Sequence, residues 1–222
     1  MKIFWHKQEI LNSELLLLFN GWGFDPKIFS ETDIPLHDIV SVYDYSDIKP
    51  EQFEFTRLYA KVKIVAWSYG VFVADFYSES IHNVTKAIAV NGSTTPIDDD
   101  KGIPVKIFRA TMESFNARNR EKFYLRIAGG MSAYNRTAGK LPDRNVENQL
   151  AELKSLYQLS LENRTPTLNW TVAIISTNDK IFPLENMKNA WGDKAVIVEG
   201  DHYPNFDDIE QIIIPCLCDR EF

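Results

Sequence analysis

Cysteine is scarce in this sequence. The 222 residues include two cysteines, Cys216 and Cys218, which flank a single residue near the end of the chain. Such a pair is too close for an ordinary structural disulfide and too few for a zinc site. We therefore expect both thiols to pack on a last helix, and this usage favours a reducing cytoplasm.

The sequence also lacks an excess of basic residues and any long apolar run. Its formal net charge is −7, which argues against a general nucleic-acid binder. The apolar run after Glu14 extends only from Leu15 to Phe19, whereas a helix needs about 20 apolar residues to span a bilayer. We expect neither a membrane span nor a signal peptide, and hence a cytoplasmic location.

Histidine is sparse too, and its spacing argues against a metal site. The four histidines lie far apart, and no H-x-x-H or H-E-x-x-H motif occurs. No glycine-rich phosphate loop follows a predicted strand, so nucleotide binding is not supported either. We expect no metal and no other cofactor.

What the chain does contain is an alternation of short apolar runs and helix-compatible segments. The runs predict strands at residues 1–7, 14–19, 39–43, 62–65, 85–90, 170–175 and 195–198. Helical segments are predicted at residues 52–59, 69–80 and from about 207. This alternation implies right-handed crossovers, so the fold class is α/β with a mainly parallel sheet in one domain, residues 1–222.

The alternation stops between residues 96 and 166. This segment contains no clear buried strand and predicts polar helices at residues 104–119, 121–127 and 146–161, with a glycine-containing gap between the last two. An insertion between strands of a parallel sheet, near the edge where the loops gather, predicts a helical cap over a site. A second lobe without a role in ligand binding is the alternative.

A serine stands where a predicted strand meets the helix after it. The surrounding sequence is Val65-Ala66-Trp67-Ser68-Tyr69-Gly70. A tight strand-to-helix turn needs small residues two positions either side of the serine, and here these are Ala66 and Gly70. The pattern is G-x-S-x-G with alanine in the first position, and it predicts a nucleophile at Ser68. A buried serine in an ordinary turn is the alternative.

A nucleophilic serine needs a histidine to take its proton and an acid to orient that histidine. His202 follows the last predicted strand, so it reaches the same sheet edge as Ser68 and is the candidate base. The other three histidines suit surface or strand-end positions. Asp179 is the one carboxylate in the loop after the preceding strand, which gives the order serine, acid, histidine. Asp201 is a competing acid, although adjacent loop side chains usually diverge.

An acyl-transfer site also needs backbone N–H groups that bind the oxyanion. One donor is expected from Tyr69, the residue after the nucleophile, at the N-terminus of its helix. The second is expected from Trp22, within the Gly21-Trp22-Gly23 loop that follows the buried second strand. A plain turn with a core tryptophan is the alternative. Together, these placements predict a serine hydrolase with the α/β-hydrolase fold.

The same motifs resemble a known family. Four strings carry the likeness: Gly21-Trp22-Gly23, Trp67-Ser68-Tyr69-Gly70, Asp179-Lys180-Ile181-Phe182-Pro183 and Gly200-Asp201-His202-Tyr203-Pro204. They are similar to those of the BioG group of pimeloyl-acyl-carrier-protein methyl ester esterases, compact relatives of the BioH-type esterases of biotin synthesis.

The resemblance implies a role for each of these residues. Ser68 would be the nucleophile, Asp179 the acid and His202 the base, with Trp22 and Tyr69 as oxyanion donors. The implied reaction removes the methyl group from pimeloyl-carrier methyl ester, with acyl carrier protein as the partner. Two positions depart from the broader hydrolase pattern: Ala66 replaces a glycine, and Asn20 stands where many hydrolases have histidine.

The predicted cap is rich in basic residues. Residues 103–144 contain nine basic and three acidic residues, and six of the nine arginines of the chain. Acyl carrier proteins are acidic and their prosthetic group bears a phosphate, so a basic cap would attract such a partner. The candidate contacts are Arg109, Arg118, Arg120 and Arg126. A solvated helical face, balanced by the acidic body, is the alternative.

Two other functions remain open at this point. A general short-chain carboxylesterase or thioesterase would use the same three catalytic residues on free esters. A non-catalytic hydrolase-like module that binds an acyl group or a protein is the second alternative, although the complete set of serine, acid and histidine argues against it.

Overall fold

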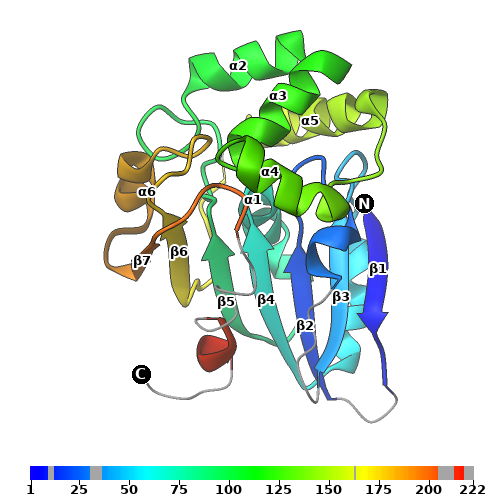
Figure 1. Ribbon diagram of the computed structural model, residues 1–222. Helices are drawn as coiled ribbons and strands as arrows, with labels where there is room; N and C mark the ends of the chain where they lie inside the picture. The colour runs from blue at the N-terminus through cyan, green and yellow to red at the C-terminus, as the bar shows by residue number, and fades with distance from the viewer. Residues whose placement is uncertain (10–12, 31–36, 163, 205–212, 218–222) are drawn as a thin grey trace.

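A computed structural model gives the fold of the chain (Figure 1). It describes residues 1–9, 13–30, 37–162, 164–204 and 213–217. Within these ranges, no helix is long and apolar enough to cross a membrane.

A seven-stranded sheet forms the centre of the molecule, in the order β1-β3-β2-β4-β5-β6-β7. Its first strand is antiparallel to β3, and every other pair of neighbours is parallel. This confirms the predicted α/β class and the mainly parallel sheet. The strands are β1 (Lys2–Lys7), β2 (Glu14–Phe19), β3 (His37–Tyr43), β4 (Lys61–Trp67), β5 (Val84–Val90), β6 (Val172–Ser176) and β7 (Ala195–Val198).

The two central strands are buried on both faces. Residues 15–19 of β2 and residues 62–67 of β4 are all inaccessible to solvent or nearly so. Continuous apolar sequence is what a parallel strand needs when helices or loops cover both sides of the sheet. The buried sheet centre therefore provides a rigid base for the loops at its carboxyl edge.

The helices that flank the sheet are short. Helix α1 (Tyr69–Phe76) packs against β4 and β2, and α6 (Leu184–Trp191) packs against β6 and β7. The helix predicted at residues 52–59 is the 3-10 helix η2 (Pro50–Leu58). Other 3-10 turns are η1 (Pro26–Phe29), η3 (Ser78–Ser80) and η5 (Gly192–Lys194).

Between β5 and β6 the chain forms a group of helices, which Figure 1 shows above the carboxyl ends of the parallel strands. They are α2 (Val105–Ser114), α3 (Ala117–Ile127), α4 (Met131–Thr137), η4 (Ala138–Lys140) and α5 (Val146–Ser160). We call residues 96–166 the cap segment.

Two details of the cap segment differ from the sequence-based expectation. The single helix predicted at residues 104–119 is divided, because Phe115 has an extended backbone and the side chain of Asn116 caps α3 by accepting from the Asn119 N–H. Helix α4 lies in the predicted gap, since Gly129 and Gly130, with positive φ, turn the chain before it rather than replacing it.

The last helix predicted from about residue 207 falls partly outside the described residues. Residues 213–217 are helical, and the half-buried Cys216 packs against the core. Cys218 lies outside the described residues.

Candidate active site

Ser68 occupies a strained turn between β4 and α1. Its φ of 57° and ψ of −127° lie where residues with a side chain are rarely found. The turn is possible because Gly70 has no side chain: a Cβ there would lie 2.5 Å from the Phe19 carbonyl oxygen. Gly92 is equally constrained, since its Cβ would lie 2.2 Å from the Ser68 carbonyl oxygen. The local backbone therefore holds the Ser68 side chain at the carboxyl edge of the sheet.

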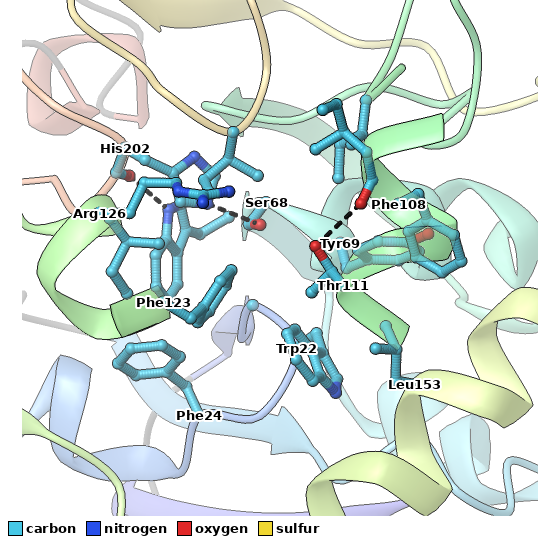
Figure 2. Close-up of a pocket in the computed structure, with 16 residues that line it drawn as sticks. Trp22, Phe24, Ser68, Tyr69, Phe108, Thr111, Phe123, Arg126, Leu153 and His202 are labelled. Atoms are coloured by element: carbon cyan, nitrogen blue, oxygen red, sulfur yellow. Dashed lines mark hydrogen bonds between the residues drawn. The ribbon is translucent and has the colours of Figure 1, made fainter. Parts of the chain in front are cut away.

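The structure brings Ser68, His202 and Asp179 together in one chain of hydrogen bonds. The Nε2 atom of His202 lies 3.0 Å from Ser68 Oγ, and its Nδ1 atom lies 2.8 Å from Asp179 Oδ2 (Figure 2 shows the Ser68 contact). All three side chains are almost completely buried. In this arrangement Nδ1–H donates to the carboxylate and Nε2 accepts the hydroxyl proton.

The loop after β6 fixes the carboxylate of Asp179. Its second oxygen, Oδ1, accepts hydrogen bonds from the backbone N–H groups of Ile181 (2.7 Å) and Phe182 (2.9 Å). The Phe182 ring stacks on the His202 ring, with centroids 5.8 Å apart. Asp179 therefore has both oxygens engaged, one in its own turn and one on the histidine.

Among the described contacts, the imidazole has no hydrogen bond to the Asp201 carboxylate. A Cβ at Gly129 would overlap the Asp201 carboxylate, so this carboxylate lies against the turn between α3 and α4. Burial raises the pKa of the Asp201 carboxyl, although the charge of Lys180 opposes this effect. Asp179 is thus the carboxylate that the imidazole contacts.

The backbone of the His202 loop is held by residues that sequence reasoning did not single out. The side-chain amide of Asn91 donates to the carbonyl oxygens of Asp201 and His202, both at 3.1 Å, and to Ser176 Oγ. The Trp67 indole N–H also donates to the His202 carbonyl, at 3.0 Å. The available signal was position, since Asn91 is the polar residue directly after β5.

The loop after β2 lies beside Ser68. A Cβ at Gly21 would lie 2.9 Å from the Trp67 ring and 3.1 Å from Ser68 Cβ, so a larger residue there would force its neighbours to shift. The Asn20 side chain donates to the Asp25 carbonyl at 2.7 Å and thus braces the loop. The neighbouring Gly23 has a positive φ of 78°. Among the described residues, no acceptor is found for the backbone N–H of Trp22 or of Tyr69.

An apolar cavity adjoins Ser68 and His202. Figure 2 shows Phe24 and Phe123 on one side of Trp22 and Phe108, Thr111 and Leu153 on the other. The free volume of the cavity is about 30 Å³, so it is narrow. Half of its wall comes from the cap segment: Ile103, Ile107, Phe108, Thr111, Phe123, Arg126, Ile127 and Leu153.

The four candidate carrier-binding arginines differ in exposure. Arg109, Arg118 and Arg126 are exposed, and Arg126 also lines the cavity. Arg120 is half-buried, and its guanidinium donates to the Arg144 carbonyl oxygen at 3.0 Å.

Arg144, one of the nine basic residues counted in residues 103–144, does not contribute to the surface. It is buried and forms ion pairs with Asp44 (3.1 Å) and Glu152 (2.7 Å). The outward positive charge of residues 103–144 is therefore one less than the sequence count suggests.

Metal ligation has no visible basis in the part of the chain that the structure describes. No three histidine, cysteine, aspartate or glutamate side chains come together there in a group that could hold an ion. What the arrangement offers is a hydroxyl beside a histidine, a carboxylate that orients this histidine, two N–H groups for which the described residues supply no acceptor, and an apolar wall. Such a set is suited to acyl transfer.

Comparison with known proteins agrees with this chemistry. The family described as "Pimeloyl-ACP methyl esterase BioG" matches residues 2–210. A Haemophilus influenzae protein is 34% identical over 193 residues, which cover 85% of this chain and 88% of that protein. A Bacteroides fragilis malonyl-[acyl-carrier protein] O-methyltransferase is 36% identical over 184 residues, which cover 82% of this chain but only 37% of the methyltransferase.

Solved structures give the same picture. The crystal structure of BioG from H. influenzae superposes with a TM-score of 0.82 and 31% sequence identity, and covers 92% of this chain and 94% of that one. A putative non-heme bromoperoxidase, BpoC, from Mycobacterium tuberculosis has a TM-score of 0.69 at 9% identity over 100% of this chain and 97% of its own, which shows a shared fold. The fold is that of the α/β-hydrolases, and the chain belongs to the BioG family of pimeloyl-ACP methyl esterases.

Proposed function

We propose that this protein is a serine esterase that hydrolyses the methyl ester of pimeloyl-[acyl-carrier protein] in biotin biosynthesis. The observation that carries the proposal is the hydrogen-bonded chain of Ser68, His202 and Asp179 beside an apolar cavity, in a member of the BioG family. Ser68 is the nucleophile, His202 the base and Asp179 the acid that orients it.

The first half of the reaction forms an acyl-enzyme. Ser68 Oγ attacks the ester carbonyl carbon while His202 Nε2 takes the hydroxyl proton, and Asp179 stabilises the resulting imidazolium. The backbone N–H groups of Trp22 and Tyr69 donate to the oxyanion, and Tyr69 adds the favourable field of the α1 N-terminus. The C–O bond to the methoxy group then breaks, and methanol leaves with the proton from His202.

The second half releases the acid. His202 takes a proton from a water molecule, which attacks the acyl carbon through a second oxyanion. Collapse of this intermediate breaks the bond to Ser68 Oγ, and the proton returns from His202 to that oxygen. The products are methanol and a carrier-bound pimeloyl group with a free terminal carboxylate.

The lining of the cavity matches the apolar character of the methylene chain of a pimeloyl group, and its side chains must move for the chain to enter, because the free volume is about 30 Å³. The cavity wall is predominantly aromatic and aliphatic, and among the described residues that line it Arg126 is the one side chain with a permanent charge. We infer that the cap segment, residues 96–166, covers the site and that its exposed Arg109, Arg118 and Arg126 attract the acidic carrier. Arg120 contributes less, since its guanidinium is held within the cap.

The Bacteroides fragilis relative supports a methyl ester as the substrate. An O-methyltransferase that acts on a carrier-bound malonyl group makes a methyl ester, and this is the bond that the proposed esterase breaks. The rest of that longer chain lies outside the match. A substrate that is bound to acyl carrier protein also favours a cytoplasmic location for the reaction.

The test is the mass of the carrier. Purified protein incubated with pimeloyl-carrier methyl ester is expected to convert the ester to the free acid, and the Ser68→Ala variant is expected not to. If the carrier mass does not change while the protein hydrolyses small free esters, the protein is a general carboxylesterase. Unchanged turnover in the Ser68→Ala variant would overturn the serine mechanism.

A further inference from the structure

Helix α5 holds the loop that carries the Trp22 N–H group. The Trp22 indole N–H donates to the Gln149 carbonyl oxygen at 2.7 Å, and the Gln149 side-chain amide donates to the Gly23 carbonyl oxygen at 2.8 Å. The Gly23 N–H donates to Glu152 Oε2 at 3.0 Å. All three bonds are buried, and they join segments of the chain that are more than 120 residues apart.

Glu152 is the centre of this contact. Its carboxylate is completely buried and accepts from the N–H groups of Gly23 and Tyr45 (2.9 Å) and from the Arg144 guanidinium (2.7 Å). Burial raises the pKa of the Glu152 carboxyl, and Arg144 together with the two N–H donors opposes this effect. Donors reach both oxygens of Glu152, and a carboxylate accepts hydrogen bonds without donating any.

Gln149 connects the loop to a second helix of the cap segment. Its side-chain amide donates to Gly23 O and also to the Tyr124 hydroxyl, at 2.7 Å, in α3. Gly23 has a positive φ, and a Cβ there would lie 3.2 Å from the Gln149 amide nitrogen. The tight contact limits how far the loop could move toward α5.

We propose that Gln149 and Glu152 are positioning residues that hold the Trp22 N–H group where the oxyanion forms. Neither residue lines the cavity, so both act through the loop and not on the substrate. Glu152 fixes the N–H of the Trp22–Gly23 peptide, Gln149 fixes the carbonyl of the following Gly23–Phe24 peptide, and the α5 backbone fixes the Trp22 indole. The inference rests on the proposed function, because it requires Trp22 to be an oxyanion donor.

This arrangement makes the cap segment part of the catalytic machinery. A donor must point at the oxyanion and not at the ground-state carbonyl oxygen, so small displacements of the loop weaken the transition state more than the substrate complex. Removing the α5 contacts is therefore expected to lower kcat and to leave KM almost unchanged.

Two substitutions remove the side-chain contacts while keeping side chains of similar size. Gln149→Leu leaves the Gly23 carbonyl and the Tyr124 hydroxyl without the amide donor. Glu152→Gln turns one acceptor into an amide donor, which then faces the N–H of Gly23 or of Tyr45. For each variant we expect kcat to fall about 10- to 100-fold. This fall is no larger than the one that follows removal of a whole oxyanion donor.

The matched control is Ser155→Ala, on the same helix. Ser155 Oγ donates to the Ser46 carbonyl oxygen at 3.0 Å, so it ties α5 to the loop after β3 and not to the oxyanion loop. We expect this variant to keep the kcat of the unmodified protein. A thermal melt of each variant shows whether Gln149→Leu and Ser155→Ala are equally folded; where Glu152→Gln fails to fold, Gln149→Leu decides.

The deciding measurement is the affinity for an alkyl trifluoromethyl ketone, whose adduct with Ser68 carries an oxyanion. Affinity is expected to fall in Gln149→Leu by the same factor as kcat, measured on a small free ester. Equal kcat and equal affinity in Gln149→Leu and Ser155→Ala would overturn the positioning role. The small ester and the ketone both test the oxyanion site without the carrier. If the protein does not hydrolyse the carrier-linked ester, that result counts against the proposed function only, and the positioning role can still be judged from the small ester and the ketone.

Discussion

The Nε2 atom of His202 lies 3.0 Å from Ser68 Oγ, although 134 residues separate the two in the chain. The contact forms because both residues follow parallel strands, β4 and β7, whose carboxyl ends meet at one edge of the sheet. The order of the strands in the sheet therefore brings these residues together, and the role of each can be tested separately.

The acid of the site can be identified by comparing the two candidate carboxylates. Asp179→Asn is expected to lower kcat by about 10³- to 10⁴-fold with little change in KM, because the amide no longer stabilises the imidazolium. Asp201→Asn is the control, since its carboxylate lies against the Gly129 turn. Steady-state kinetics on a small ester measure both, and a larger loss in Asp201→Asn would reverse the assignment.

The strand-to-helix turn at Ser68, which we call the elbow, can be tested by adding one carbon at Gly70. In Gly70→Ala the new Cβ would lie 2.5 Å from Phe19 O, so the backbone of the elbow must shift. We expect the free energy of unfolding to fall by about 1–3 kcal/mol, together with a loss of activity. Gly139→Ala is the control, because no atom lies within 4 Å of its Cβ. Urea denaturation compares the two, and equal midpoints would show that the elbow tolerates the side chain.

Asp44 predicts a pH dependence of stability. Burial alone would raise its pKa, but hydrogen bonds from Lys2 and Ser46 and the charge of Arg144 outweigh burial and lower the pKa from 3.8 to about 2. A carboxyl group with a lowered pKa in the folded state adds stability above its ordinary pKa, and this stability is lost as the pH falls toward the folded value.

The free energy of unfolding is thus expected to drop between pH 3.8 and about 2. The free energy of unfolding of the Asp44→Asn variant should drop less over this range. That of Asp193→Asn, a substitution at an exposed position, should follow the unmodified protein. Chemical denaturation at several pH values measures the difference. The same slope in all three proteins would exclude this role for Asp44.

The carrier contact predicts a selective effect of charge reversal. Replacing Arg118 and Arg126 by glutamate is expected to lower kcat/KM about tenfold or more on the carrier-linked ester, and much less on a small free ester. Arg57→Glu is a control outside the cap segment, in η2. Added salt should weaken turnover of the carrier-linked ester in the unmodified protein. Equal losses on both substrates would argue against carrier recognition by these arginines.

The order of the elements and the catalytic loops could be predicted from the sequence because both depend on local patterns. The continuous apolar run before Gly21 marks a central strand, and the small residues around Ser68 mark a sharp turn. Asp179 and His202 then follow from their positions after successive strands. None of these inferences requires knowledge of how the cap segment packs.

The residues that hold the loops around Ser68 and His202 could not be predicted in the same way. Asn91, Gln149 and Glu152 are ordinary polar residues in the sequence, and their roles depend on contacts across 85 to 129 residues. Glu152 and Arg144 would both be assigned to the surface by composition, since buried charges are rare unless paired. The sequence does not predict helix α4, because adjacent glycines usually end a helix. Here Gly129 and Gly130 form the turn that precedes α4.

The most direct test of the account is a competition between two substrates in one reaction. Pimeloyl-carrier methyl ester and the dimethyl ester of free pimelic acid are mixed at equal concentration with the protein, and the mass of each is followed over time. The ratio of the initial rates equals the ratio of kcat/KM values. We predict that the carrier-linked ester is consumed first, and that Ser68→Ala consumes neither. Consumption of the free ester while the carrier keeps its methyl group would contradict the account.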